Sequence, residues 1–289
     1  MNPMKLSITL LLGIIFLTGC NSNSKEEKDL ALAITNNENF QLVKEKARDL
    51  IESGFNAGEG YGAIWIRDLN TFMELSCEVV DQKIIHEKLI VFFKFQGSDG
   101  NIVDGYRPWD AKKKKKTDGA IYSDLAPDFF AHKNTVETDH ETSLIQGVFK
   151  YVMKTGDKEM LKVDVGGMTV AKRMEFALEF LMNQRYNEDF GLIWGGTTAD
   201  WGDVQPEDLP GVLLSENTHY ALDIYDNAML VIAIKNFIEL MPDAAVKWSP
   251  VLEQLQINIM KQILLFQMIL MRTRYSIMEA QPLPLKLVC

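Results

Sequence analysis

The sequence has 289 residues, which is enough for one large domain or two small ones. Its formal net charge of −10 argues against general nucleic-acid binding, and its hydrophobic fraction of 47% is ordinary for a soluble globular protein. The three cysteines, Cys20, Cys77 and Cys289, are too far apart for a zinc motif and indicate no disulfide scaffold, and with four scattered histidines we expect no metal and no cofactor.

The amino terminus has the pattern of a bacterial export signal. Lys5 supplies a positive charge, and residues 6–17 form an apolar run that is too short to span a bilayer comfortably. The run ends in Leu-Thr-Gly-Cys at residues 17–20, which resembles a lipobox, so we expect residues 1–19 to be a signal peptide and Cys20 to be lipidated. A plain secretory signal with a chance cysteine is the alternative.

The segment that follows Cys20 is polar and charged, and we expect residues 20–37 to be a tether between the lipid and the fold. Position 21 is asparagine and not the aspartate associated with inner-membrane retention. We therefore expect a protein of the bacterial cell envelope, anchored in the outer membrane.

From residue 38 the apolar residues recur at helical spacing, and polar loops separate the helical stretches. One helix is expected to open with a capping box formed by Thr138 and Glu141 and to stop at Gly156. The other expected helices cover residues 40–52, 69–80, 84–95, 168–184, 219–241 and 244–265. Strands do not alternate with helices, so we expect an all-α domain over residues 38–266, built as an incomplete toroid of helical hairpins.

Three junctions between loops and helices combine aromatic, acidic and glycine residues. They cover residues 61–68, 135–141 and 194–203. An indole can stack on the apolar face of a pyranose, and Asp and Arg side chains can bind its vicinal hydroxyl groups. Together the junctions predict a sugar-binding site at one end of the helical array.

The motifs Trp-Ile-Arg-Asp at residues 65–68, Glu-Thr-Asp at residues 137–139 and Thr-Ala-Asp-Trp-Gly-Asp at residues 198–203 resemble the six-hairpin glycosidases. This superfamily includes glucoamylases, trehalases and the glucosidase part of glycogen debranching enzymes, and its fold is an (α/α)6 barrel. The resemblance implies that Trp65 stacks on the sugar, that Arg67 and Asp68 bind its hydroxyl groups, and that Asp139 is the general acid. It also implies that the same pocket is lined by Asp200, Trp201 and Asp203, with Asp226 and Asn227 as weaker candidates.

The physical case for Asp139 contains two opposing effects. A general acid needs a raised pKa, whereas the amino terminus of a helix lowers the pKa of an acid. Burial and the neighbouring Glu137 and Glu141 act in the opposite direction. The sequence does not settle the balance, and Glu141, which the capping box also explains, is the alternative acid.

An inverting glycosidase needs a second carboxylate as base, and in the resembled enzymes it comes from the last hairpins of the barrel. Residues 267–289 show no amphipathic order, which suggests a shifted reading frame or a truncated gene. We therefore expect that the intact form hydrolyses oligosaccharides, that this chain lacks the base, and that an exposed apolar face promotes self-association. A carbohydrate-binding lipoprotein without catalysis is the alternative function.

Overall fold

The computed structural model describes residues 25–53, 62–109, 119–196 and 212–280, with side chains up to residue 265. The chain divides into two compact units, Met1–Leu50 and Ile51–Cys289. In the first unit the described residues form helix α2 (Lys25–Thr35) and most of helix α3 (Glu38–Ser53). The side chain of Asn37 accepts hydrogen bonds from the first amides of α3, which explains why that helix begins there.

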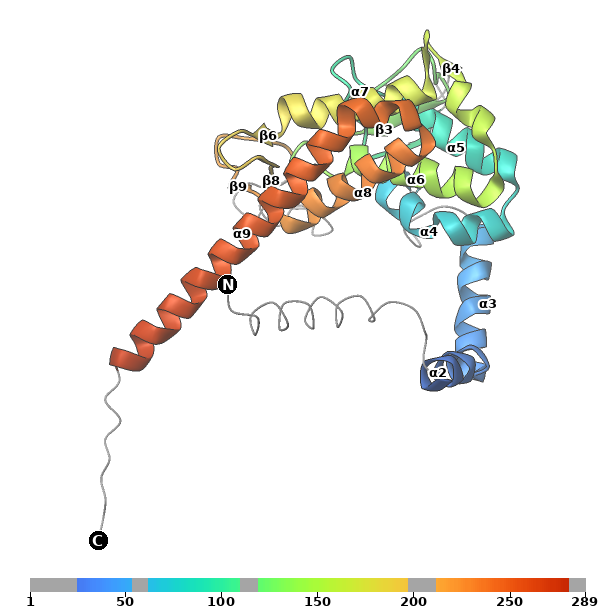
Figure 1. The fold of residues 1–289 in the computed structure, drawn as a ribbon. Helices are drawn as coiled ribbons and strands as arrows, with labels where there is room; N and C mark the ends of the chain where they lie inside the picture. The colour runs from blue at the N-terminus through green and yellow to red at the C-terminus, as the bar shows by residue number, and fades with distance from the viewer. Residues whose placement is uncertain (1–24, 54–61, 110–118, 197–211, 281–289) are drawn as a thin grey trace. The chain divides into compact units, whose positions relative to one another are not determined.

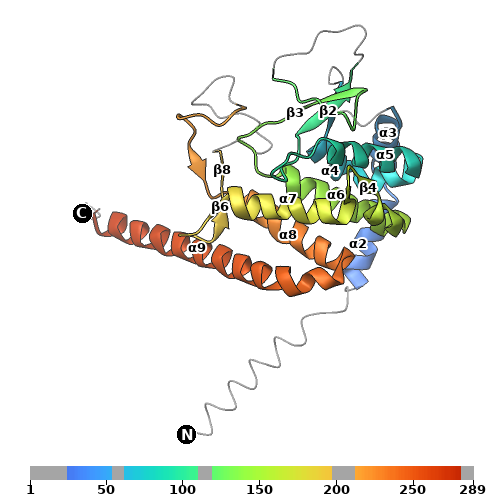
Figure 2. The ribbon, with the colours of Figure 1, turned by 90° about the horizontal axis from the view of Figure 1, so that it is seen from above.

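The second unit is mostly helical, as the sequence predicted. Its described residues form three successive pairs of helices, which Figures 1 and 2 show around helix α6. The pairs are α4 (Ile66–Val79) with α5 (Gln82–Lys94), α6 (His140–Thr155) with α7 (Val170–Gln184), and α8 (Ile224–Leu240) with α9 (Ala245–Ala280). Within the described part of the chain, no helix combines the length and the hydropathy needed to cross a bilayer.

Helix α6 is the centre of the second unit and contacts helices α4, α5, α7 and α8. All residues from His140 to Val148 are buried, and Tyr151 and Val152 continue the buried stripe. The helix ends at Gly156, whose φ of 75° is a left-handed conformation that favours glycine. Because α6 is covered on several sides, the polar residues in its first turn lie inside the protein and must find partners there.

The long connections between the helices contain short antiparallel strands. The largest sheet has the order β1–β2–β3, formed by β1 (Ile64–Trp65), β2 (Gly105–Pro108) and β3 (Phe129–His132). In its register Trp65 faces Gly105, and a Cβ atom on Gly105 would lie 2.7 Å from the Trp65 ring, so only glycine allows this approach. The sheet thereby fixes Trp65 directly before the start of α4.

Three further strand pairs occupy the connections after α6. They are β4 (Asp164–Val165) with β5 (Met168–Thr169), β6 (Tyr186–Asn187) with β7 (Leu192–Ile193), and β8 (Gly195–Gly196) with β9 (Tyr220–Ala221). Short 3-10 helices are also present: η1 (Lys158–Lys162) follows α6, and η2 (Pro242–Ala244) follows α8. Residues 191–194 lie in the connection between α7 and α8, and Leu192 and Ile193 within them form β7.

Candidate functional site

Helices α4, α6 and α8 begin at the same place, and their first residues meet at Asp139. Asp139 directly precedes α6, Arg67 is the second residue of α4, and Tyr225 is the second residue of α8. Arg67 Nη1 lies 3.4 Å from Asp139 Oδ1, and the Tyr225 hydroxyl donates to Asp139 Oδ2 at 3.1 Å. Three segments that are far apart in the sequence therefore share one carboxyl group.

Asp139 has the electrostatic surroundings of a proton donor. Its side chain is 0% exposed, and this burial raises the pKa of Asp139 by more than Arg67 lowers it. A carboxyl group with a raised pKa keeps its proton at a higher pH than an ordinary aspartic acid does. Burial therefore outweighs the groups that lower the pKa of Asp139, which are His140, Arg67 and the Tyr225 hydroxyl.

Glu141 is equally buried but is held as an anion. Its Oε1 atom accepts a hydrogen bond from the Ile102 amide at 2.7 Å and lies 3.0 Å from Lys133 Nζ. Burial alone would raise the pKa of Glu141, but Lys133 and the Ile102 amide are among the groups that lower it below its usual value. Glu141 therefore anchors the segment around Ile102 and is a poor proton donor.

The predicted capping box of Thr138 and Glu141 is wrong. Asp139, and not Thr138, is the residue before the helix, and its side chain makes no capping hydrogen bond. The Thr138 hydroxyl donates to the backbone oxygen of Trp194 at 3.0 Å, while Glu141 binds Ile102 and Lys133. Both side chains make long-range contacts in the buried interior, where such partners compete with the local cap.

His140 joins the acids of this cluster into one network. Its Nε2 atom contacts Glu137 and lies 3.3 Å from Asp104 Oδ1, and its Nδ1 atom lies 3.1 Å from Lys133 Nζ. Burial and Lys133 lower the pKa of His140, but Glu137 and Asp104 outweigh them and raise it to about 9, so the ring is protonated near neutral pH. Glu137 also binds Arg67, with 2.7 Å between Oε1 and Nη1, so each cation of the network faces at least one acid.

The atoms of Asp104, Glu137 and His140 are close enough together to hold a metal ion. The arrangement of protons argues against this use, because Nε2 of His140 would have to lose its proton to bind a cation. Arg67 already pairs with Glu137, and Lys133 lies 3.1 Å from His140 Nδ1, so positive charge stands next to two of the three residues. We therefore read the group as an ion-pair network within the described residues.

The other predicted site residues of the first junction lie beside this network. Trp65 is half-buried and stacks on His132, with ring centroids 6.4 Å apart. Asp68 is half-buried in the first turn of α4, and burial raises its pKa more than Arg67 lowers it. Asp200, Trp201, Asp203 and the lipidation residue Cys20 lie outside the described residues.

The two weaker candidates on α8 differ in their surroundings. The side-chain amide of Asn227 bonds both the nitrogen and the oxygen of Ile193, at 2.9 Å each, which gives it a structural role. Asp226 is buried, and a Cβ atom on Gly195 would lie 2.7 Å from its Oδ2 atom. Glycine at position 195 therefore allows β8 to pass directly over the start of α8.

Sequence reasoning missed three contributors to the network: Asp104, Lys133 and Tyr225. Asp104 and Lys133 lie in the connection between α5 and α6 and next to the short strands β2 and β3, where no periodic pattern marks them. Tyr225 stands next to the candidate Asp226, but nothing in the local sequence shows that its hydroxyl reaches Asp139.

The described site thus consists of a buried acid whose pKa is raised, a buried cation and a phenol that contact it, and a neighbouring acid bound by a lysine. Such a combination can transfer a proton to a bound ligand. Comparison with known proteins finds no family model that matches this chain and no curated protein that matches its sequence.

Proposed function

We propose that this protein is a glycoside hydrolase-like protein that acts on oligosaccharides, with Asp139 as the general acid. The observation that carries the proposal is the contrast between two neighbouring buried acids. The pKa of Asp139 is raised, whereas the pKa of Glu141 is lowered, so Asp139 is the better suited of the two to act as a proton donor. We further propose that the helix pairs are part of an (α/α)6 toroid, since alternate helices begin at a shared site.

In the proposed reaction Asp139 protonates the glycosidic oxygen while the bond between that oxygen and the anomeric carbon breaks. A water molecule then attacks the anomeric carbon and loses its proton to a base, which gives inversion. Arg67 and Tyr225 contact both oxygens of Asp139 and stabilise the carboxylate that remains. Trp65 and Asp68, with Asp200, Trp201 and Asp203, are proposed to bind the sugar.

The base is not assigned to any acid of the described network. Glu137, Glu141 and Asp104 are engaged with Arg67, Lys133 and His140. A carboxylate bound in this way is a weak base, because its cation stabilises the charged form.

The proposal predicts that the change Asp139→Asn abolishes hydrolysis. Release of reducing sugar from α- and β-linked gluco- and manno-oligosaccharides should fall by about 10²–10⁴-fold, which is the usual contribution of a general acid. Trp65→Phe keeps an aromatic face and should lose less activity than Asp139→Asn. Hydrolysis that Asp139→Asn leaves unchanged would contradict the assignment of Asp139 as the general acid.

The alternative is a carbohydrate-binding protein without catalysis. It is favoured by the complete burial of Asp139, since the described residues leave this carboxyl group 0% exposed. Sugar binding that is retained by Asp139→Asn, in the absence of any product, would support this alternative.

We also propose that Cys20 carries lipid and attaches the protein to the outer membrane. Expression in a bacterial host with labelled fatty acid should label the protein, and Cys20→Ala should abolish the label. Cys77→Ala, which changes a half-buried cysteine of α4, is the matched control and should keep it. Equal labelling of all three proteins would overturn the proposal.

A further inference from the structure

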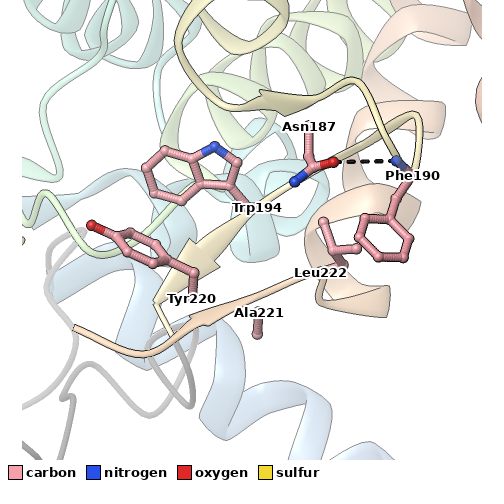
Figure 3. Close-up of a pocket in the computed structure, with 6 residues that line it drawn as sticks. All are labelled: Asn187, Phe190, Trp194, Tyr220, Ala221 and Leu222. Atoms are coloured by element: carbon pink, nitrogen blue, oxygen red, sulfur yellow. Dashed lines mark hydrogen bonds between the residues drawn. The ribbon is translucent and has the colours of Figure 1, made fainter.

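A cavity of about 600 Å³ lies beside the candidate site and is not used by the proposed chemistry. It is lined by Asn187, Phe190, Trp194, Tyr220, Ala221 and Leu222. Figure 3 shows Trp194 and Tyr220 on one side and Phe190 with Leu222 on the other, with Asn187 between them. This volume lies within the usual range for small-molecule sites.

The lining is aromatic and uncharged, which restricts the chemistry of a ligand. Tyr220 is 61% exposed and Phe190 is 45% exposed, so their rings offer apolar surface that is open to contact. None of the six lining residues carries a charge, so a charged ligand would lose its hydration without a partner there. A neutral ring with one apolar face fits this surface.

Asn187 adds one directed polar group. Its Oδ1 atom accepts from the Phe190 amide at 3.2 Å, as the dashed line in Figure 3 shows. Among the described residues no hydrogen bond engages its Nδ2 group, which lies on the side away from Phe190. The pocket therefore presents a fixed donor that can bind a hydroxyl oxygen.

The aromatic wall is held in place without a ligand. The Arg185 guanidinium packs over the Trp194 ring at 4.4 Å from the ring centroid, and the Tyr220 ring meets Trp194 nearly perpendicularly at 4.9 Å. A ring that is fixed before binding loses little conformational entropy when a ligand stacks on it.

The same wall is attached to the segment that carries Asp139. The Trp194 oxygen accepts from the Thr138 hydroxyl at 3.0 Å, and the Gly196 amide donates to the Val136 oxygen at 2.8 Å. Tyr225, which donates to Asp139, is the second residue of α8 and follows the lining residue Leu222 by three positions. The wall of the pocket is thus joined by hydrogen bonds and by the chain to the segments that meet at Asp139.

We propose that this pocket binds one pyranose ring of a neutral sugar. The ring stacks with Trp194 and Tyr220 on one side and Phe190 on the other, and Asn187 Nδ2 donates a hydrogen bond to one of its hydroxyl groups. The choice of a sugar rests on the proposed function, while the neutral ring and the hydroxyl contact follow from the lining. The pocket is then a second binding position beside Asp139 that serves an oligosaccharide longer than one unit.

The test uses maltose and cellobiose as probes, with saturation-transfer NMR and tryptophan fluorescence as readouts. Tyr220→Ala should weaken binding by about three- to tenfold, the usual effect of an aromatic contact. Asn187→Asp keeps the acceptor for Phe190 but removes the donor, and should weaken binding as well. Trp194→Phe should keep binding by NMR but lose the fluorescence change.

Two exposed residues provide matched controls. Phe72→Ala removes an aromatic ring that is 37% exposed on α4, and Asn183→Asp makes the same amide-to-acid change on α7. Both should bind the probes as the unaltered protein does. Unchanged binding in Tyr220→Ala and Asn187→Asp, or preference for indole over both sugars, would overturn the pocket assignment.

The outcomes also separate the pocket from the proposed hydrolysis. Asp139→Asn should keep the pocket signals, because Asp139 is not among the lining residues. Sugar binding that depends on Tyr220, without any product, would support the non-catalytic alternative and keep the pocket assignment. Product formation, together with undiminished sugar binding in the pocket variants, would support the hydrolase and reject the pocket assignment.

Discussion

Arg67→Leu should lower the free energy of unfolding by about 3–5 kcal/mol, the range found when one partner of a buried ion pair is removed. Arg67 lies between Glu137 at 2.7 Å and Asp139 at 3.4 Å, and both acids are buried. Without the guanidinium, Glu137 would be left with His140, and Asp139 would keep only the Tyr225 hydroxyl among the contacts described for it. The loss should be smaller in acid, where protonation of Asp139, whose pKa is raised, removes one of the two charges that Arg67 faces.

Urea unfolding measures this effect, with the midpoint and slope read separately. Lys162→Ala is the matched control, because Lys162 and Glu159 also lie 2.7 Å apart but are 72% and 78% exposed. An exposed pair of this kind contributes roughly 0–1 kcal/mol. Equal effects of the two changes would show that the Arg67 cluster is not buried as described.

Glu141→Gln and Asp139→Asn should change stability in opposite directions, although each replaces a buried acid with its amide. Glu141→Gln leaves Lys133 without its anion and should cost about 3–5 kcal/mol near neutral pH. Asp139→Asn removes a carboxyl group that burial makes costly to ionise, and it should stabilise the protein near neutral pH.

The pH dependence follows from the directions of the two pKa shifts. The folded-state pKa of Glu141 lies below its ordinary value of 4.5, so its stabilisation is present above that value and is lost as the pH falls through the folded pKa. The folded-state pKa of Asp139 lies above its ordinary value of 3.8, so its stabilisation is present in acid and is lost as the pH rises through the folded pKa. Urea unfolding of both variants, near neutral pH and in mild acid, measures the two signs. Destabilisation by Asp139→Asn at neutral pH would contradict the account.

The sequence predicted the helices well because each one carries its own signal. The expected helices at residues 69–80, 84–95 and 168–184 match α4, α5 and α7 within about three residues at each end. Helix α8 begins at Ile224, five residues later than expected, because Tyr220 and Ala221 pair with β8 and Asp223 caps the helix. Local periodicity cannot show such pairing, since the partner strand is more than twenty residues away.

The last helix shows a different limit. The sequence predicted a helix over residues 244–265 and a tail without amphipathic order from residue 267, whereas α9 continues to Ala280. Lack of an apolar stripe argues against packing of one helical face, but it does not prevent the backbone from forming a helix.

The site was predictable in part, because its chemical groups stand in short motifs but its contacts do not. Arg67 and Asp139 were named from separate motifs, and the structure brings them within 3.4 Å. Lys133 and Asp104 were missed, because their importance comes from the fold around His140 and not from neighbours in the sequence. Long-range contacts likewise explain why Thr138 and Glu141, which have the spacing of a capping box, do not cap the helix.

The central claim is that Asp139 holds its proton more strongly than an ordinary aspartic acid does. Carbon-13 NMR of aspartate-labelled protein, with Asp139→Asn to assign the signal, measures its titration directly. We expect a pKa above the ordinary value of 3.8, with a further rise in Arg67→Leu because Arg67 lowers it. A carboxyl signal for residue 139 that titrates at or below 3.8 would contradict the account.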